Sequence, residues 1–321
     1  MSKGVGMRVL VTGGAGYIGR EVTKALVARG DSVVVFDAGG PARARLHGGA
    51  SSQISVVDGD ITDLAGLVAA CKAEKPDAIV HCAAVVGVVF SLSSPSNVVR
   101  VNVQGSINVF EAMRLCGIKR IVHMSTEEVY GDFGAPIVQE DHPAEPRMPY
   151  GITKLAVEHL GRTYRELHGI DPINLRTSWV YGVGLPRPRP PTTFLDAALE
   201  GRTYHLDHGG DAAIDFTYMS DVVSGILCAL DVKKHNYDVY NLASGEATSL
   251  KKMIEVIKQL IPGARLSVAD GPYRFLDGLL APTKGALDVT RAREIGYSPK
   301  FDLKRGFEAY IQESLSQHSQ T

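Results

Sequence analysis

Short apolar runs alternate with stretches of helical periodicity along the first half of the chain. Runs without polar interruption predict β-strands at residues 8–12, 32–36, 54–57, 78–81, 121–123 and 173–175. Between them, apolar residues at helical spacing predict α-helices at residues 17–29, 63–73, 97–115 and 150–167. Strands that are apolar at consecutive positions are typical of parallel sheets with both faces covered. The pattern therefore predicts an α/β protein built on a doubly wound parallel sheet.

After about residue 181 the pattern changes. Residues 184–191 read Gly-Leu-Pro-Arg-Pro-Arg-Pro-Pro, and a helix cannot start within so dense a run of prolines. Shorter elements follow, and the last of them is an amphipathic helix near residues 302–314. We therefore expect a larger domain of residues 1–181 and a smaller C-terminal lobe of residues 182–321. Residues from about 215 to 245 are expected to return to the larger domain.

Composition and charge exclude several classes of protein. The 321 residues carry 34 Lys and Arg against 35 Asp and Glu, so the net charge of −1 offers no basic surface for nucleic acid or an anionic membrane. No apolar run reaches the ~18 residues of a transmembrane helix. The cysteines stand singly, at Cys71, Cys82, Cys116 and Cys228, which disfavours a disulfide framework or a zinc site and suits reduced thiols. We expect a cytoplasmic enzyme that binds no nucleic acid, membrane or metal.

A glycine-rich turn lies between the first predicted strand and the first predicted helix. The segment Thr-Gly-Gly-Ala-Gly-Tyr-Ile-Gly ends at residue 19 and repeats glycine at every third position. Glycines at this spacing let backbone N–H groups approach a pyrophosphate at the positive N-terminus of the helix. The turn predicts a Rossmann dinucleotide site formed by Gly13, Gly16, Tyr17, Ile18 and Gly19, against the alternative of a glycine-rich turn without a ligand.

Asp37 ends the second predicted strand and selects the cofactor. A carboxylate at this place accepts hydrogen bonds from both ribose hydroxyls of an adenosine and repels a 2′-phosphate, so we expect NAD rather than NADP. Arg43 and Arg45 follow in a loop beyond the carboxylate, and we give them no role. Asp60 and Ile61 follow the third strand and are expected to lie near the adenine.

Tyr150 and Lys154 stand four residues apart at the start of a predicted helix, on one face. Alone, such a pair is more often incidental, but the preceding strand ends in Met-Ser-Thr-Glu-Glu, at the edge where α/β sheets place ligands. A nearby cation favours the phenolate of a tyrosine, whose unperturbed pKa is about 10. We therefore expect Tyr150 to be a general base, helped by Lys154, which also holds ribose hydroxyls of the cofactor. Ser125 and Thr126 are expected to face the substrate.

Together these motifs resemble the extended short-chain dehydrogenase/reductase family, in its NAD-dependent epimerase/dehydratase branch. The resemblance continues at residues 81–84, 102–108, 287–292 and 295–299, and so covers nearly the whole chain. It implies that Ala83, Ala84 and Asn102 belong to the NAD site. It also implies that Thr126 binds the reacting hydroxyl while Tyr150 takes its proton, and that hydride loss to NAD leaves a keto intermediate. Family members pair the helices at 97–115 and 150–167, so we expect a homodimer whose smaller lobes bind the substrate.

Glu127 and Glu128 are the variable part of this constellation. In 4,6-dehydratases of the resembled family an acidic pair here eliminates water from the keto intermediate, and decarboxylases carry a glutamate at the position of Glu128. Simple 4-epimerases often have small residues instead. The pair leaves open whether Glu127 and Glu128 perform acid/base catalysis or only stabilise the adjoining loop.

Two positions depart from the nucleotide-sugar members of the resembled family. Those members carry an arginine where this chain has Ile214 and an asparagine where it has Trp179, and both side chains help to bind a diphosphate. Trp179 offers instead an aromatic face for a sugar or a base, or a core side chain. The loss of charge-assisted contacts weakens phosphate binding unless another basic residue compensates. The candidates are Arg187, Arg189, Arg202, Arg274 and Lys284.

These observations favour an NAD-dependent, sugar-modifying enzyme of the nucleotide-sugar epimerase/dehydratase type, which recycles its NAD. Two alternatives stay open. The first is an NAD-dependent dehydrogenase or reductase of a sugar or sugar acid without a nucleotide. The second is a catalytically silent protein that senses NAD.

Overall fold

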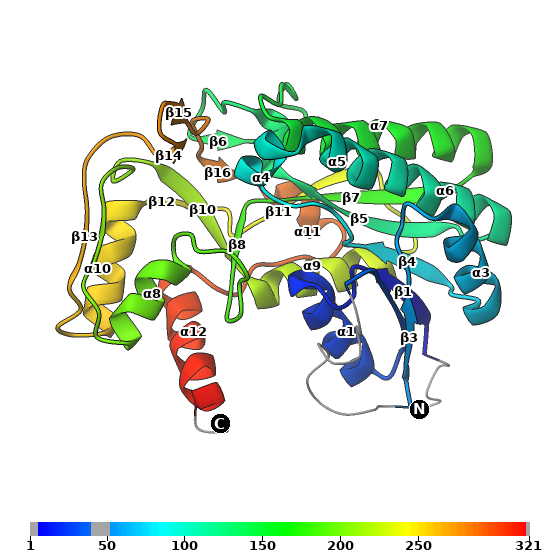
Figure 1. Ribbon diagram of the computed structural model, residues 1–321, viewed down its shortest axis with the longest axis horizontal. Helices are drawn as coiled ribbons and strands as arrows, with labels where there is room; N and C mark the ends of the chain where they lie inside the picture. The colour runs from blue at the N-terminus through cyan, green and yellow to red at the C-terminus, as the bar shows by residue number, and fades with distance from the viewer. Residues whose placement is uncertain (1–5, 40–51, 319–321) are drawn as a thin grey trace.

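A seven-stranded sheet forms the larger part of the molecule (Figure 1). The computed structural model describes residues 6–39 and 52–318. The strands are β1 (Arg8–Thr12), β2 (Ser32–Asp37), β3 (Ile54–Asp58), β4 (Ala78–His81), β5 (Arg120–Thr126), β7 (Asp171–Thr177) and β11 (Val239–Leu242). Their order is β11-β7-β5-β4-β1-β2-β3, and every neighbouring pair is parallel. This arrangement confirms the predicted doubly wound parallel sheet.

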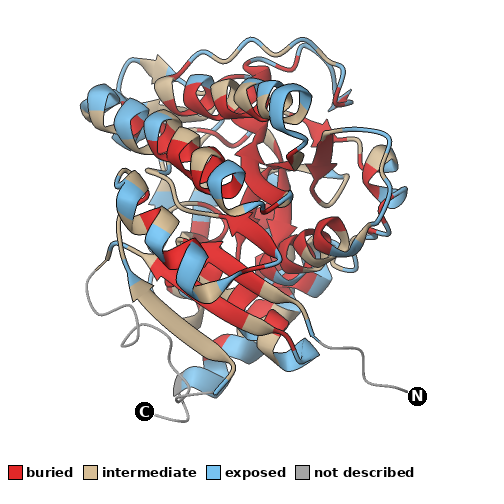
Figure 2. Ribbon diagram, turned by 90° about the vertical axis from the view of Figure 1, so that its right-hand side faces the viewer, coloured by how far each residue is buried: buried red, intermediate tan, exposed pale blue. Residues whose placement is uncertain are grey.

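Helices cover both faces of the sheet (Figure 1). One face carries α1 (Tyr17–Arg29) and α9 (Met219–Asp231), and the other carries α3 (Leu64–Glu74), α6 (Gly105–Cys116) and α7 (Pro149–His168). Successive strand residues point to opposite faces, so Val9 packs in the cluster of Leu26 and Leu10 in the cluster of Phe110. Figure 2 shows the resulting buried strands between partly exposed helices. Burial on both faces explains why these strands lack polar alternation.

Some elements extend beyond their predicted bounds. The helix expected at 97–115 is a composite of α5 (Pro95–Val99), a π-helical turn η1 (Arg100–Gln104) and α6, and α4 (Val88–Ser93) precedes it. Strands β5 and β7 continue to Thr126 and Thr177, because polar residues at their carboxyl ends interrupt the apolar pattern but not the backbone pairing. The polar residues expected at the strand end are therefore part of the sheet itself.

The smaller lobe has a hydrophobic core of its own, in which Phe194, Leu250 and Phe307 are fully buried. Its sheet has the order β12-β10-β8. The strands are β8 (Trp179–Tyr181), β10 (Ala213–Tyr218) and β12 (Ala247–Ser249), and the helices are α8 (Thr192–Leu199), α10 (Leu250–Leu260) and α12 (Leu303–His318). Between β10 and β12 the chain returns to the large sheet as α9 and β11. The two parts of the molecule are therefore interleaved along the sequence.

Short strand pairs complete the described chain. They are β9 (Tyr204–Leu206) with β13 (Leu266–Val268), β14 (Arg274–Leu276) with β15 (Leu279–Leu280), and β6 (Ile137–Val138) with β16 (Ala286–Leu287), followed by α11 (Thr290–Arg293). Strand β14 contacts α4, so the C-terminal region reaches across the carboxyl edge of the large sheet. No helix within residues 6–39 and 52–318 is long and apolar enough to cross a membrane.

Candidate active site

A cavity of about 1270 Å³ opens at the carboxyl ends of the central strands, between the large sheet and the smaller lobe. In doubly wound sheets this edge is where ligands bind. The residues expected from the sequence that line it are Gly13, Gly16, Tyr17, Ile18, Gly19, Asp37, Asp60, Ile61, Ala83, Ala84, Ser125, Thr126, Glu127, Glu128, Tyr150, Lys154 and Trp179. Residues expected for the cofactor and for the substrate therefore face one space.

The glycine turn between β1 and α1 is too tight for side chains. The Gly16 N–H donates to the Gly13 carbonyl at 2.9 Å. Gly13 has a φ of +66°, and a Cβ there would lie 2.7 Å from the backbone nitrogen of Ala83. At Gly19 a Cβ would lie 2.2 Å from the Gly13 carbonyl oxygen. The bare backbone at the start of α1 therefore fits the pyrophosphate of a dinucleotide.

Asp37 lies at the cavity wall beside this turn. Its Oδ2 accepts a hydrogen bond from the Ala15 N–H at 3.1 Å, and its Oδ1 accepts one from the Gly39 N–H at 2.9 Å. These bonds hold the carboxylate where it fits the ribose hydroxyls of NAD. Arg43 and Arg45 lie outside the described residues.

Asn102 lies behind the cavity rather than on its wall. Its side chain accepts a hydrogen bond from the Val85 N–H at 2.8 Å and donates to the Val85 carbonyl at 3.0 Å and the Thr153 hydroxyl at 3.1 Å. Both ends of the amide are thus occupied. Asn102 positions the loop that carries Ala83 and Ala84, which differs from the direct place in the cofactor site that the sequence led us to expect.

Tyr150 and Lys154 enter the cavity from the first turns of α7, close to the end of β5. The Thr126 side chain hydrogen bonds to the Tyr150 phenol. Burial raises the pKa of Tyr150 to about 12, and the charges of Arg187 and Arg189 oppose this rise. Arg187 and Arg189 therefore favour the phenolate, a contribution that the sequence did not lead us to expect.

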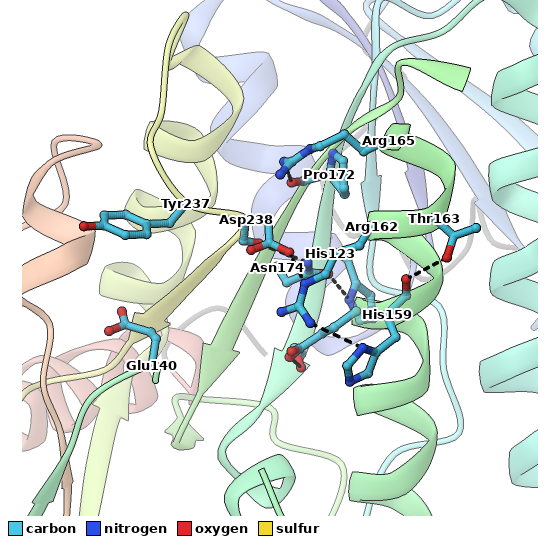
Figure 3. Close-up of polar contacts among 12 residues, drawn as sticks. His123, Glu140, His159, Arg162, Thr163, Arg165, Pro172, Asn174, Tyr237 and Asp238 are labelled. Carbon is cyan, nitrogen blue, oxygen red and sulfur yellow. Dashed lines mark hydrogen bonds and ion pairs between the residues drawn. The ribbon is translucent and has the colours of Figure 1, made fainter. Parts of the chain in front are cut away.

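Lys154 is held by groups behind the cavity. Its ammonium donates to the Met124 carbonyl at 2.7 Å and faces Nε2 of His123 at 3.4 Å. His123 Nδ1 lies 2.9 Å from Asn174 Oδ1, and the Asn174 amide donates to the Asp238 carbonyl (Figure 3). His123 therefore donates through Nδ1 and accepts through Nε2. Burial lowers the pKa of Lys154 to about 8 and lowers the pKa of His123, which stays neutral.

The Ser125 hydroxyl is turned toward a buried ion pair. It donates to Oε1 of Glu158 at 2.6 Å, and Arg176 donates to both oxygens of the same carboxylate at 3.0 and 2.6 Å. Arg176 is 3% exposed and Glu158 is fully buried, and the guanidinium also lies 4.6 Å from the Tyr130 ring centroid. The pair joins α7 to β7, and no local sequence pattern indicates it, because its members lie on different elements.

Glu127 and Glu128 form the single turn η2 (Glu127–Tyr130) that follows β5, and they have different surroundings. Glu127 is 1% exposed; its Oε2 accepts a hydrogen bond from the Ser178 hydroxyl at 2.6 Å, and its Oε1 has no partner among the described residues. Burial raises the pKa of Glu127 to about 7, although the charge of Lys284 opposes the rise. Glu128 lies 3.4 Å from the Lys284 ammonium. One carboxyl group is therefore enclosed and has a raised pKa, and the other is paired with a cation.

Trp179 and Ile214, the two departures from the family pattern, lie in different places. Trp179 lines the cavity between Phe216 and Tyr273, which meet its ring edge-on at centroid distances of 6.2 and 5.3 Å. The guanidinium carbon of Arg189 lies 5.2 Å from the same ring centroid. Ile214 is buried in the core of the smaller lobe and presents no polar group to the cavity.

Comparison with known proteins agrees with this geometry. Residues 9–243 match the model of the NAD dependent epimerase/dehydratase family. The UDP-glucose 4-epimerase of Mycolicibacterium smegmatis is 34% identical over 312 residues, which are 94% of this chain and 96% of the relative. The putative UDP-glucose 4-epimerase of Methanocaldococcus jannaschii is 30% identical over 319 residues, which are 94% and 97% of the two chains.

Solved structures agree as well. The UDP-glucose 4-epimerase of Thermotoga maritima with UDP-glucose has a TM-score of 0.85 at 27% identity, over 96% of this chain and 100% of that one. The UDP-glucose 4-epimerase of Thermus thermophilus in complex with NAD has a TM-score of 0.83 at 27% identity, over 95% and 98%. Because the family match spans most of the chain and the glycine turn and Asp37 fit NAD, the chain is an enzyme of the NAD dependent epimerase/dehydratase family, with NAD as its cofactor.

Proposed function

We propose that the chain is a UDP-sugar 4-epimerase that keeps NAD bound and recycles it in each turnover. The observation that carries the proposal is that Thr126, Tyr150 and Lys154 line the same cavity as the glycine turn and Asp37. A general base and a dinucleotide site in one space suit the removal of a proton and a hydride from one carbinol. The nucleotide-sugar substrate is supported by full-length relatives that are named UDP-glucose 4-epimerases.

In this proposal Tyr150 takes the proton of the sugar 4-hydroxyl and later returns it. Thr126, which hydrogen bonds to the phenol, orients that hydroxyl. When bound, NAD would supply the hydride acceptor for the oxidation at C4 and, once reduced, the hydride donor for the reverse step. Lys154 holds ribose hydroxyls of the cofactor, and His123 and the Met124 carbonyl fix its ammonium.

Incubation of the purified protein with UDP-glucose, UDP-galactose and UDP-glucuronate tests the proposal. Chromatography identifies the products, and absorbance reports NADH. We expect an epimerised sugar without net formation of NADH. Stoichiometric NADH would support a dehydrogenase that releases its cofactor, and would contradict the proposal. Tyr150→Phe should abolish product formation, whereas the control Tyr164→Phe, whose hydroxyl contacts Glu111 instead, should not.

A second candidate function is elimination of water from the same keto intermediate. Glu127 favours it, because an enclosed carboxyl group with an unpartnered Oε1 and a pKa of about 7 suits a proton donor at neutral pH. Glu128, beside Lys284, then suits the base. A product lighter by one water in mass spectrometry, absent with Glu127→Gln, would support this reaction. Epimerised products that all retain the water would exclude it.

We infer that the chain forms a homodimer through α5, α6 and α7, because α5 and α6 both contact α7. Val99, Leu115, Ile152 and Leu167 are between 49% and 69% exposed on these helices. Exposed apolar side chains on adjacent helices are what a four-helix interface covers. Light scattering at micromolar concentration is expected to give the dimer mass, and Ile152→Glu to reduce it. A monomer mass for the unaltered protein would contradict the inference.

A cytoplasmic location also remains a proposal. Its support is that Cys71, Cys82, Cys116 and Cys228 are free thiols in the described chain, as suits a reducing compartment.

A further inference from the structure

Isoleucine at position 214 raises the question of which cation binds an anionic substrate. Three of the five basic residues considered from the sequence, Arg202, Arg274 and Lys284, do not line the cavity. Arg202 is exposed and forms an ion pair with Glu200. Arg274 lies 3.5 Å from Asp207. Neither is placed to contact a ligand in the cavity.

Lys284 is occupied as well. Its ammonium faces Glu128 at 3.4 Å, donates to the Gly131 carbonyl at 3.4 Å, and lies 5.1 Å from the Phe133 ring centroid. Its charge is thus compensated by a carboxylate of the site. This leaves Arg187 and Arg189 among the five candidates.

Arg187 and Arg189 both line the cavity. Arg187 donates from Nη1 to the Val86 carbonyl at 2.8 Å. Neither arginine forms an ion pair with a carboxylate in residues 6–39 and 52–318. Burial lowers the pKa of Arg189, and the charge of Arg187 lowers it further, so the two cations are close enough to repel. Two neighbouring cations without a carboxylate partner favour an anionic ligand.

The Arg189 guanidinium is anchored on one side and free on the other. Its Nη2 donates to the Val180 carbonyl at 2.8 Å, and its Cζ lies over the Trp179 ring, 5.2 Å from the centroid. Its Nε is enclosed without a hydrogen-bond partner, and its Nη1 makes no hydrogen bond to a described residue. An enclosed N–H without a partner is costly, so a ligand oxygen that accepts from it is favoured.

We propose that Arg189, which lies over the Trp179 ring and lines the same cavity as Arg187, binds the diphosphate of the substrate and replaces the arginine missing at position 214. The inference rests on the proposed function, because it takes the substrate to be a nucleotide sugar. A diphosphate offers several acceptor oxygens and more than one negative charge, which match two guanidinium groups; a neutral sugar hydroxyl does not. A guanidinium group then still binds the diphosphate, but it is supplied by Arg189 in the loop before α8 instead of by a residue at position 214 on β10.

Calorimetry on the NAD-loaded protein tests the assignment, with UDP, uridine and free glucuronate as the probes. Glucuronate is included because guanidinium groups also bind carboxylates. The variants are Arg189→Gln, Arg189→Lys and the control Arg202→Gln, which alters an exposed arginine outside the cavity. NAD affinity and melting temperature, measured for each variant, report whether it folds.

We expect Arg189→Gln to weaken UDP binding by roughly 10- to 100-fold, the range for a lost charge-assisted hydrogen bond. Arg189→Lys should lose part of this affinity, since it keeps the charge but not the planar fork. Uridine binding should not change, Arg202→Gln should match the unaltered protein, and added salt should weaken UDP binding less in Arg189→Gln. If Arg189→Gln does not fold, Arg189→Lys decides by the same comparison.

Unchanged UDP affinity in both Arg189 variants would overturn the inference, and so would undetectable UDP binding by the unaltered protein. A loss of glucuronate binding with UDP binding intact would also overturn it, because the anion would then be a carboxylate. Failure of the proposed function looks different: UDP binding would depend on Arg189, but no UDP-sugar would be epimerised.

Discussion

Replacement of Glu127 by glutamine tests the electrostatics of the site through stability. The side chain is 1% exposed, and burial raises its pKa from the ordinary 4.5 to about 7. Glutamine keeps the shape and can still accept from Ser178, but it does not ionise. Because the folded pKa is the higher one, the stability that Glu127 contributes is fully present below about pH 4.5 and is lost as pH rises through about 7.

The magnitude follows from the two pKa values. A difference of about 2.5 corresponds to about 3 kcal/mol between the fully protonated and fully ionised limits. Most of this difference falls between pH 5 and pH 8. Urea denaturation with saturating NAD should therefore show that the unaltered protein loses about 2–3 kcal/mol more than Glu127→Gln over this interval. The surface control Glu200→Gln should follow the unaltered protein.

Parallel stability curves for the unaltered protein and Glu127→Gln would refute the reasoning. They would mean that Glu127 has the same proton affinity in the folded and unfolded chain, despite its enclosure. A steeper loss in Glu127→Gln than in the unaltered protein would refute the sign of the effect as well.

Three further predictions concern catalysis, the cofactor and the fold. Tyr150→Phe should lower kcat by ~10²–10⁴-fold and leave NAD affinity unchanged, because the phenol acts on the reacting hydroxyl. A loss of kcat below about tenfold would contradict the general-base role. NAD should bind more tightly than NADP in a direct titration, and Asp37→Asn should reduce this difference in affinity. Equal affinities of the unaltered protein for NAD and NADP would be inconsistent with the place of Asp37 at the cavity wall. Glu158→Gln should lower the free energy of unfolding by about 3–5 kcal/mol, since it leaves the buried Arg176 without its carboxylate. If Glu158→Gln had the same free energy of unfolding as the exposed control Glu255→Gln, this reasoning would be wrong.

Local patterns in the sequence determined the sheet and the cofactor half of the site. Strand β1 and helix α1 occupy the bounds that the apolar runs and the glycine turn predicted. Asp37 lies at the cavity wall because it ends a strand beside that turn. Tyr150 and Lys154 share a helix face by spacing alone. These features depend on residues close in sequence, so hydrophobic period and glycine spacing are sufficient to place them.

Other parts of the site had little or no local signal. In the sequence, His123 stands out only as a polar residue in an apolar strand. Its contact with Lys154 forms only because α7 packs on β5. Asn102 belongs to a recognisable segment, but its place behind the cavity depends on Val85 and Thr153, which approach from two different elements.

The substrate half of the site was decided by the tertiary structure. Arg189 lies over the Trp179 ring, and Lys284 pairs with Glu128. Both contacts form because the smaller lobe and the C-terminal region cover the carboxyl edge of the sheet. The sequence left five basic residues equally possible, and only their packing separates them. Likewise the raised pKa of Glu127 arises from enclosure by the whole fold rather than from its neighbours along the chain. Burial and long-range pairing are properties of the packed chain, so they determine the substrate-facing electrostatics that local sequence does not.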